Sequence, residues 1–275
     1  MAVLDRGFLF GDGVYEVLRT YGGRPFELQA HLRRLEHSLR GLGLRAPMSR
    51  RRLETLIHTM LERSGYRDAR VYVQVTRGVA PRTHVFPRGI RPTLVIYVER
   101  VPAGAERRRR RGISTVTMED WRWRRCHLKA LVLLPNVLAR QAAQRQGSDE
   151  AILLGPGGIV REGAASNVFV VRGRVLRTHP LGPEILPGVS RQVVLELAQQ
   201  EGLRVRESRF RRATLLAADE VLLSSTALEI MPVVRVDGRR IGSGKPGRVF
   251  GALYARFLAR ARRPTHGRTS RARTA

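Results

Sequence analysis

The chain has little of what would place a protein outside the cell or in a membrane. Its 275 residues include one cysteine, Cys126, so no disulfide can form within the chain. Its longest apolar runs are far shorter than the roughly 20 residues that span a bilayer. The first residues, MAVLDRG, place charges where a signal peptide needs an apolar segment. We therefore expect a cytoplasmic protein that does not associate with membranes.

Lysine is almost absent, although the chain is strongly basic. Of its 51 lysine and arginine residues only Lys129 and Lys245 are lysine, and the net charge is +28. Basic chains can bind nucleic acid through its phosphates. However, aromatic residues make up only 6% of the chain, and no segment interleaves them with basic residues as single-strand-binding surfaces do. Because arginine is spread over almost every segment, we interpret it as a compositional bias and expect no nucleic-acid partner. The alternative is a basic nucleic-acid-binding protein, and the run 107–111 and the tail after Arg262 are the segments that favour it most.

The hydrophobic pattern predicts helices and strands that do not alternate strictly. Leucines spaced by four and three residues predict a helix over 27–44, and Ser49 can cap a second helix. The run PTLVIYVERV (92–101) has the composition of a buried strand. The other expected strands are 70–76, 113–118, 150–154, 166–171, 174–178, 219–226 and 232–236, and the other expected helices are 136–147, 186–203 and 248–261. This order favours an α+β fold over a doubly wound parallel sheet.

A break in the pattern near residue 105 predicts two domains. Proline, glycine and a block of arginines interrupt the helices and strands there. We predict an N-terminal α/β domain over 1–104, an arginine-rich linker over 105–112 and a C-terminal domain over 113–262. The basic tail over 263–275 is expected to be disordered.

Lys129 is the residue for which a chemical role is easiest to argue. A lysine amine can lose its proton and attack a carbonyl to form a Schiff base, whereas a guanidinium stays protonated. A bias toward arginine would remove lysines that only supply charge, but it cannot remove one whose amine reacts. Lys129 lies in an apolar run beside Leu128 and Ala130, which disfavours a charged side chain. Lys245 lies in the turn-like segment GSGKPG, where we expect it to be solvated.

Three other segments carry polar groups that suit a phosphorylated ring cofactor. Glu162 stands in REGAASNVF at an expected turn before a strand, and a carboxylate there could hold a protonated pyridine nitrogen. The segment ILPGVSR presents free backbone N–H groups and Ser190 at a helix start, an arrangement that binds phosphate. Ser225 and Thr226 offer hydroxyl groups at a strand end. Each feature alone also fits an ordinary surface glutamate, helix cap or strand end.

Together these segments resemble the fold-type-IV pyridoxal-phosphate enzymes, which include D-amino-acid aminotransferase, branched-chain aminotransferase and aminodeoxychorismate lyase. The resemblance runs in unbroken order from Asp5 to about Arg262. It is carried by DRGFLFGDGVYEVLRTYGG, HLRRL, VQVTRG, LKALVLLPNVLARQ, DEAILL, REGAASNVF, ILPGVSR and SSTALEIMPV. It implies a two-domain α+β homodimer with mixed and antiparallel sheets flanked by helices. Pyridoxal 5′-phosphate would lie in the cleft between the domains, in contact with the C-terminal one.

The resemblance also implies a role for each matching residue. Lys129 would hold the cofactor as a Schiff base and move a proton between substrate and cofactor, and Glu162 would pair with the pyridine nitrogen. Leu186 would pack against the ring. The phosphate would be bound by Arg34, Val189, Ser190, Ser225 and Thr226. No metal is implied.

The substrate-binding residues implied by the resemblance favour one member of the family. TRGVAPRTHVFP contains Arg82 and His84, and FGDGVYE supplies Tyr15. In D-amino-acid aminotransferases a matching Arg-x-His pair from the other subunit and a tyrosine bind the substrate α-carboxylate, for which an arginine fork is suited. We therefore expect transamination of a D-amino acid such as D-alanine with a 2-oxo acid such as 2-oxoglutarate. Branched-chain aminotransferase and aminodeoxychorismate lyase are the alternatives.

The chain departs from the family pattern at several positions. Ala130 and Val132 stand where the family commonly has serine and asparagine, and Ala164 and Ala165 stand where it has hydroxyl residues. Fewer polar groups would weaken the tuning of the cofactor or change the preferred substrate. The strand pair that precedes DRG in most relatives is also missing here. We expect either an earlier start codon or an unprotected edge of the first sheet.

Overall fold

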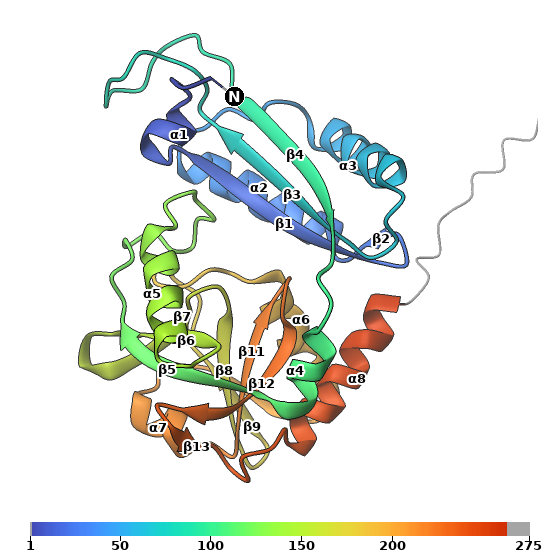
Figure 1. Ribbon diagram of the computed structural model, residues 1–275, viewed down its shortest axis with the longest axis vertical. Helices are drawn as coiled ribbons and strands as arrows, with labels where there is room; N and C mark the ends of the chain where they lie inside the picture. Colours follow the sequence, from blue (N-terminus) through green and yellow to red (C-terminus); the bar gives the residue numbers. More distant parts are fainter. Residues whose placement is uncertain (1, 263–275) are drawn as a thin grey trace, which may run out of the picture.

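The computed structural model describes residues 2–262, which form two sheets flanked by helices (Figure 1). Met1 and the expected basic tail over 263–275 lie outside the described residues. The helices are α1 (Arg6–Phe10), α2 (Leu28–Gly41), α3 (Arg50–Ser64), α4 (Ala105–Arg111), α5 (Leu134–Arg145), α6 (Val189–Gln200), α7 (Arg212–Leu216) and α8 (Arg248–Arg262). The strands are β1 (Gly13–Tyr21), β2 (Arg24–Pro25), β3 (Ala69–Thr76), β4 (Thr93–Arg100), β5 (Ile113–Glu119), β6 (Glu150–Gly155), β7 (Ile159–Gly163), β8 (Asn167–Arg172), β9 (Val175–Thr178), β10 (Arg204–Glu207), β11 (Glu220–Ser225), β12 (Glu229–Val236) and β13 (Arg239–Arg240).

The N-terminal sheet is antiparallel, with the strand order β2-β1-β3-β4. Helices α2 and α3 cover one face of it (Figure 1). Their leucine stripes pack on the alternate buried residues of β1 and β3, and Leu32, Leu35 and Ile57 contribute to this core. Both helices were predicted, and the Ser49 side chain accepts the amide hydrogen of Arg52 as an N-cap.

Strand β4 corrects one expectation from the sequence. Its apolar run predicted a buried strand, but most of its residues are only partly buried, and Tyr97 is 45% exposed. The physical reason is position, because β4 is the edge strand and no helix of residues 2–262 covers the second face of the sheet. On that face the Tyr97 ring stacks on Tyr72, and Tyr72 stacks on Tyr15.

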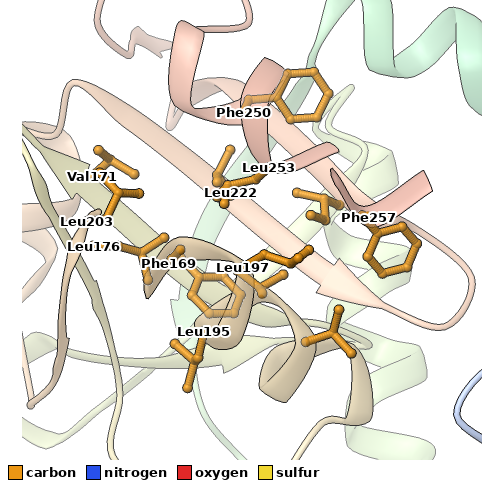
Figure 2. Close-up of a cluster of buried hydrophobic side chains, with 14 of the residues drawn as sticks. Phe169, Val171, Leu176, Leu195, Leu197, Leu203, Leu222, Phe250, Leu253 and Phe257 are labelled. Carbon is orange, nitrogen blue, oxygen red and sulfur yellow. The ribbon is translucent and has the colours of Figure 1, made fainter. Parts of the chain in front are cut away.

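The C-terminal sheet is mixed, as the α+β prediction required. Its strand order is β10-β9-β8-β11-β12-β5-β6-β7, and β13 pairs with β12. The pairs β9–β10, β5–β12 and β5–β6 are parallel, and the others are antiparallel. Helices α6 and α8 pack on this sheet through a core that includes Phe169, Leu222, Leu253 and Phe257 (Figure 2).

The segment expected to be a linker forms helix α4, which packs on β12. Arg109 is buried and forms an ion pair with Glu229 at the start of β12. The same carboxylate accepts a hydrogen bond of 2.6 Å from the Tyr21 hydroxyl of β1. The arginine run is therefore not a uniformly exposed basic patch, and one of its members joins the two sheets.

The turn predicted around Glu162 is a strand, because residues 159–163 pair with β6 as β7. Within residues 2–262, each helix is too short or too polar to cross a membrane.

Candidate active site

A cavity of about 440 Å³ lies where the N-terminal and C-terminal sheets meet. Its walls come from β1, α2, the segment before α5, β7, the start of α6 and the turn after β11. Most of the residues singled out in the sequence line this cavity, namely Tyr15, Arg34, Lys129, Glu162, Leu186, Val189, Ser190, Ser225 and Thr226. Residues far apart in the chain therefore converge on one site.

Lys129 is held by backbone contacts on both sides. Its carbonyl accepts the amide hydrogen of Tyr15 at 3.0 Å, and its own amide donates to the Ser38 hydroxyl of α2 at 3.0 Å. Its Nζ atom lies 4.1 Å from the centre of the Tyr15 ring. A cation–π contact of this length holds the amine beside the tyrosine, within the cavity. Lys245, in contrast, is exposed in a bend outside the cavity.

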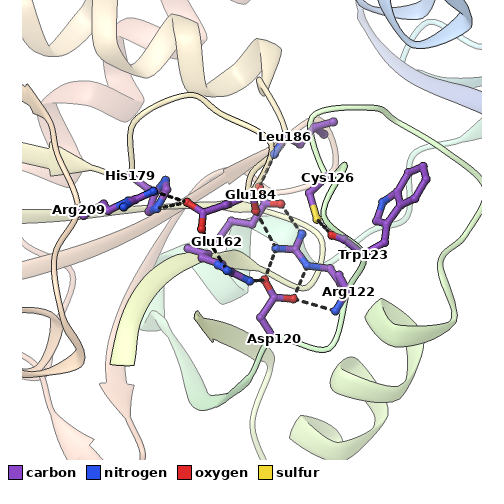
Figure 3. A network of polar contacts seen from close by, with 10 residues as sticks. Asp120, Arg122, Trp123, Cys126, Glu162, His179, Glu184, Leu186 and Arg209 are labelled. Carbon is purple, nitrogen blue, oxygen red and sulfur yellow. Dashed lines mark hydrogen bonds and ion pairs between the residues drawn. The ribbon is translucent and has the colours of Figure 1, made fainter. Parts of the chain in front are cut away.

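Glu162 is buried in the cavity wall, and both of its carboxylate oxygens accept hydrogen bonds (Figure 3). One oxygen accepts a hydrogen bond from Arg122, and the other accepts from the Leu186 amide at 3.0 Å and from the Asn167 side chain at 2.9 Å. Burial raises the pKa of Glu162, and the Arg122 guanidinium opposes that rise. Charge-assisted donors of this kind hold a carboxylate in one orientation.

Arg122 connects Glu162 to a chain of charged residues that runs toward the surface (Figure 3). It donates twice to Asp120 at 2.9 Å, and Asp120 accepts from Arg161 at 2.9 Å. Arg161 in turn donates to Glu184 at 3.1 Å. Burial would raise the pKa of Asp120, but hydrogen bonds from Arg122 and Arg161 hold it below its usual value.

Sequence reasoning missed the residues that hold Glu162. Arg122 is one arginine among many in the segment DWRWRR, and nothing local distinguishes it. Asn167 lies inside REGAASNVF, the segment already singled out for Glu162, so its position was an available signal. Only the folded chain shows that both contact the same carboxylate.

The cavity wall also carries hydrogen-bond donors that have no partner among the described residues. Helix α6 starts at Val189, so its first N–H groups are free at the cavity wall, and Ser190 is buried beside them. The Ser224 hydroxyl also lines the cavity and is buried without a partner among the described residues. Free N–H groups at a helix start, together with a buried unpaired hydroxyl, suit an anionic group such as a phosphate.

Arg34 contributes a guanidinium group to the cavity wall, beside the loop before α6. Its side chain donates to the buried Glu16 carboxylate at 2.7 and 2.8 Å and to the Pro187 carbonyl at 3.1 Å. Glu16 is also 2.9 Å from His31 Nδ1. The carboxylate therefore fixes the guanidinium against the loop that precedes α6. Because Glu162 and these donors line the same cavity, the residues fit a cofactor that has a basic ring nitrogen and a phosphate.

Arg82 and His84 are the predicted site residues that the structure does not bring to the cavity. Both are exposed on the loop between β3 and β4. The Arg82 guanidinium carbon lies 5.3 Å from the centre of the Phe10 ring, and the His84 ring lies 5.5 Å from it. Their expected contact with the active site of another subunit stays a prediction.

The four residues that depart from the family pattern also lie at the cavity. Ala130, Val132, Ala164 and Ala165 line its wall, and these four positions supply no side-chain hydrogen-bonding group. Asn136 supplies one nearby polar contact, since its side-chain amide donates to the Ala164 carbonyl at 2.7 Å.

Comparison with known proteins defines the family. Residues 13–236 match the model for amino-transferase class IV. The chain is 42% identical to the D-alanine aminotransferase of Bacillus licheniformis over 243 residues, which are 88% of this chain and 85% of that protein. It is 37% identical to the D-alanine aminotransferase of Staphylococcus epidermidis over 254 residues, 92% of this chain and 89% of that protein.

Solved structures agree with this assignment. The T.th. branched-chain amino acid aminotransferase with pyridoxamine 5′-phosphate superposes with a TM-score of 0.89 at 29% identity, covering 96% of this chain and 90% of that one. The Escherichia coli branched-chain amino acid aminotransferase gives a TM-score of 0.88 at 28% identity, covering 94% and 88%. The chain therefore belongs to the class IV aminotransferases. It is a pyridoxal-phosphate-dependent aminotransferase of fold type IV, as the sequence predicted.

Proposed function

We propose that this enzyme transfers the amino group of a D-amino acid to a 2-oxo acid. The observation that carries the proposal is that Lys129, Glu162 and the free donors at the start of α6 line one cavity. The preference for D-amino acids is supported by the relatives named D-alanine aminotransferase, which are 37–42% identical. The branched-chain enzymes found by structure are only 28–29% identical, so they support that alternative less well.

The cavity residues divide the task of holding pyridoxal 5′-phosphate. The Val189 and Ser190 amides, Arg34 and the hydroxyls of Ser225 and Thr226 bind its phosphate, and Leu186 packs on its ring. When bound, the cofactor supplies an aldehyde carbon that takes up the amino group and a ring that withdraws electrons. Glu162 accepts a hydrogen bond from the ring nitrogen.

Lys129 and Glu162 act at different atoms in the reaction. Lys129 would hold the cofactor through its side-chain amine. Once the substrate amine has displaced it, the freed Nζ would take the proton from the substrate Cα and return it to the cofactor carbon that carries the amino group. The Tyr15 ring, 4.1 Å from Nζ, limits the face from which the amine approaches. Glu162 would accept a hydrogen bond from the ring nitrogen, in the orientation that Arg122 and Asn167 fix. The second half of the reaction reverses these proton transfers on the 2-oxo acid.

A second copy of the chain completes the substrate site in this proposal. Tyr15 contacts the substrate α-carboxylate from within the cavity, and Arg82 and His84 reach it from the partner subunit of a homodimer. The loop that carries them also exposes Val85 and Phe86, which are 75% and 59% exposed. Adjacent exposed apolar residues are typical of a protein-binding surface.

The remaining proposals concern domains and location. The two sheets form domains over 1–104 and 113–262, joined by the segment that contains α4. The enzyme acts in the cytoplasm, where a single buried cysteine stays reduced.

Initial rates with purified protein test the activity. We expect D-alanine with 2-oxoglutarate to react, and L-leucine to react much more slowly. Activity confined to L-leucine would contradict the D-specific proposal. Borohydride reduction should attach the cofactor to a peptide that contains Lys129, and Lys245 is the matched control. A label on Lys245 would show that the active-site lysine is wrongly assigned.

A further inference from the structure

Asn167 connects three segments that line the cavity, namely Glu162 on β7, the loop before α6 and the end of β11. It begins strand β8, is 5% exposed and lines the cavity. Its side-chain nitrogen donates to Glu162 Oε2 at 2.9 Å and to the Leu186 carbonyl at 3.0 Å. The Leu186 amide donates to the same glutamate oxygen at 3.0 Å. These three hydrogen bonds close a ring between the glutamate and the loop that leads into α6.

The helix start is fitted against the same asparagine. A Cβ atom at Gly188 would lie 2.0 Å from Asn167 Oδ1, so a side chain there would displace the asparagine. Gly188 is the N-cap of α6, directly before Val189 and Ser190. The absence of a side chain at Gly188 therefore lets the helix start approach the residue that holds Glu162.

The second hydroxyl-bearing segment is attached to Asn167 through the sheet. Asn167 pairs with Ser224 in the antiparallel register of β8 and β11. Ser224 carries the buried hydroxyl that has no partner among residues 2–262, and it directly precedes Ser225 and Thr226. Asn167 therefore contacts Glu162, adjoins the start of α6 at Gly188 and pairs with Ser224.

We propose that Asn167 is a positioning residue, which orients the Glu162 carboxylate toward the ring nitrogen and sets its distance from the phosphate-binding helix start. This role rests on the proposed function, because it assumes that a pyridine nitrogen lies beside Glu162. A neutral amide suits the task, since it donates one hydrogen to the carboxylate and one to the backbone. An aspartate at this position would place a carboxylate, which only accepts, against two other acceptors, Glu162 Oε2 and the Leu186 carbonyl.

The binding of two ligands to cofactor-free protein tests this role without measuring turnover. The first ligand is pyridoxal 5′-phosphate, and the second is its analogue with carbon in place of the ring nitrogen. Quenching of tryptophan fluorescence reports the dissociation constants, because Trp123 lines the cavity. For Asn167→Ala we expect affinity for the cofactor to fall about tenfold more than affinity for the analogue, the size of one buried hydrogen bond to a charged group. Asn167→Asp should show a larger difference.

Asn136→Ala is the matched control. It also removes a side-chain amide at the cavity that donates to backbone, but it has no contact with Glu162. We expect it to change both affinities by the same factor. A second control repeats Asn167→Ala in a Glu162→Gln background, where the difference between the ligands should largely disappear.

Three results separate the possible failures. Equal weakening of both ligands by Asn167→Ala would overturn the positioning role and leave a structural one. If Asn167→Ala still weakened the two ligands by different factors in the Glu162→Gln background, Asn167 would not act through Glu162, and the proposal would be overturned. If wild-type protein bound neither ligand, the proposed function would fall as well.

Discussion

Replacement of Arg122 by methionine tests how the acid at the cavity wall is kept in place. Arg122 is 7% exposed and contacts two carboxylates, Asp120 and Glu162, which are 0% and 5% exposed. Methionine keeps an unbranched, flexible side chain that packs where the arginine stem lies, but it lacks the charged guanidinium. The variant therefore leaves two buried carboxylates without their shared partner, although Arg161 still contacts Asp120.

The size of the effect follows from the burial of all three side chains. Removing one partner of a buried ion pair costs about 3–5 kcal/mol of unfolding free energy, because the remaining charge is uncompensated. Arg209→Met is the matched control, since Arg209 is 64% exposed and pairs with Glu184. An exposed pair of this kind contributes about 0–1 kcal/mol.

The loss of unfolding free energy in Arg122→Met should depend on pH, and the direction of that dependence can be derived. Burial raises the folded-state pKa of Glu162 above its usual value of 4.5, and Arg122 opposes this. An acid with a raised folded-state pKa destabilises the fold as pH rises from the unfolded value through the folded one. Without Arg122 this penalty grows, and the stabilisation that Asp120 gives above its usual pKa is reduced. The deficit of Arg122→Met should therefore be largest near neutral pH and smaller in acid.

Urea unfolding of both variants, followed at about pH 8 and at about pH 5, measures these differences. A loss for Arg122→Met no larger than that for Arg209→Met would refute the assumption that Arg122 compensates buried charge. A loss that did not change with pH would show that the two carboxylates are not the groups responsible.

Single contacts give four further predictions. Lys129→Arg keeps the positive charge but should abolish transamination and the yellow colour of the protein; retained activity would rule out the Schiff-base role. Arg82→Ala should reduce the use of α-amino acids in steady-state kinetics while cofactor binding, measured by absorbance, stays unchanged. Glu229→Gln leaves Arg19 and the buried Arg109 without their anion and should cost about 3–5 kcal/mol in urea unfolding; a loss below about 1 kcal/mol would contradict this. Phe169→Ala should cost about 3–5 kcal/mol, because the side chain is fully buried, and an unchanged melting temperature would argue against the core in Figure 2.

Local patterns were enough to predict most helices and to single out Lys129 as the candidate reactive amine. The leucine stripe of α2 and the serine cap of α3 depend on neighbours within a few residues, so the sequence alone predicts them. Lys129 was identifiable because a bias against lysine makes a retained lysine informative. The order of motifs along the chain then indicated the family, which the comparisons confirmed.

Only the tertiary structure decided which groups surround the candidate site residue Glu162. Arg122 and Asn167 both bind Glu162, although they are 40 and five positions from it in the chain. No local signal separates Arg122 from its many arginine neighbours, because a salt bridge depends on where strands and loops meet in space. The same applies to β4, whose apolar residues predicted burial. Its exposure follows from its place at the sheet edge, which the pairing of distant strands determines.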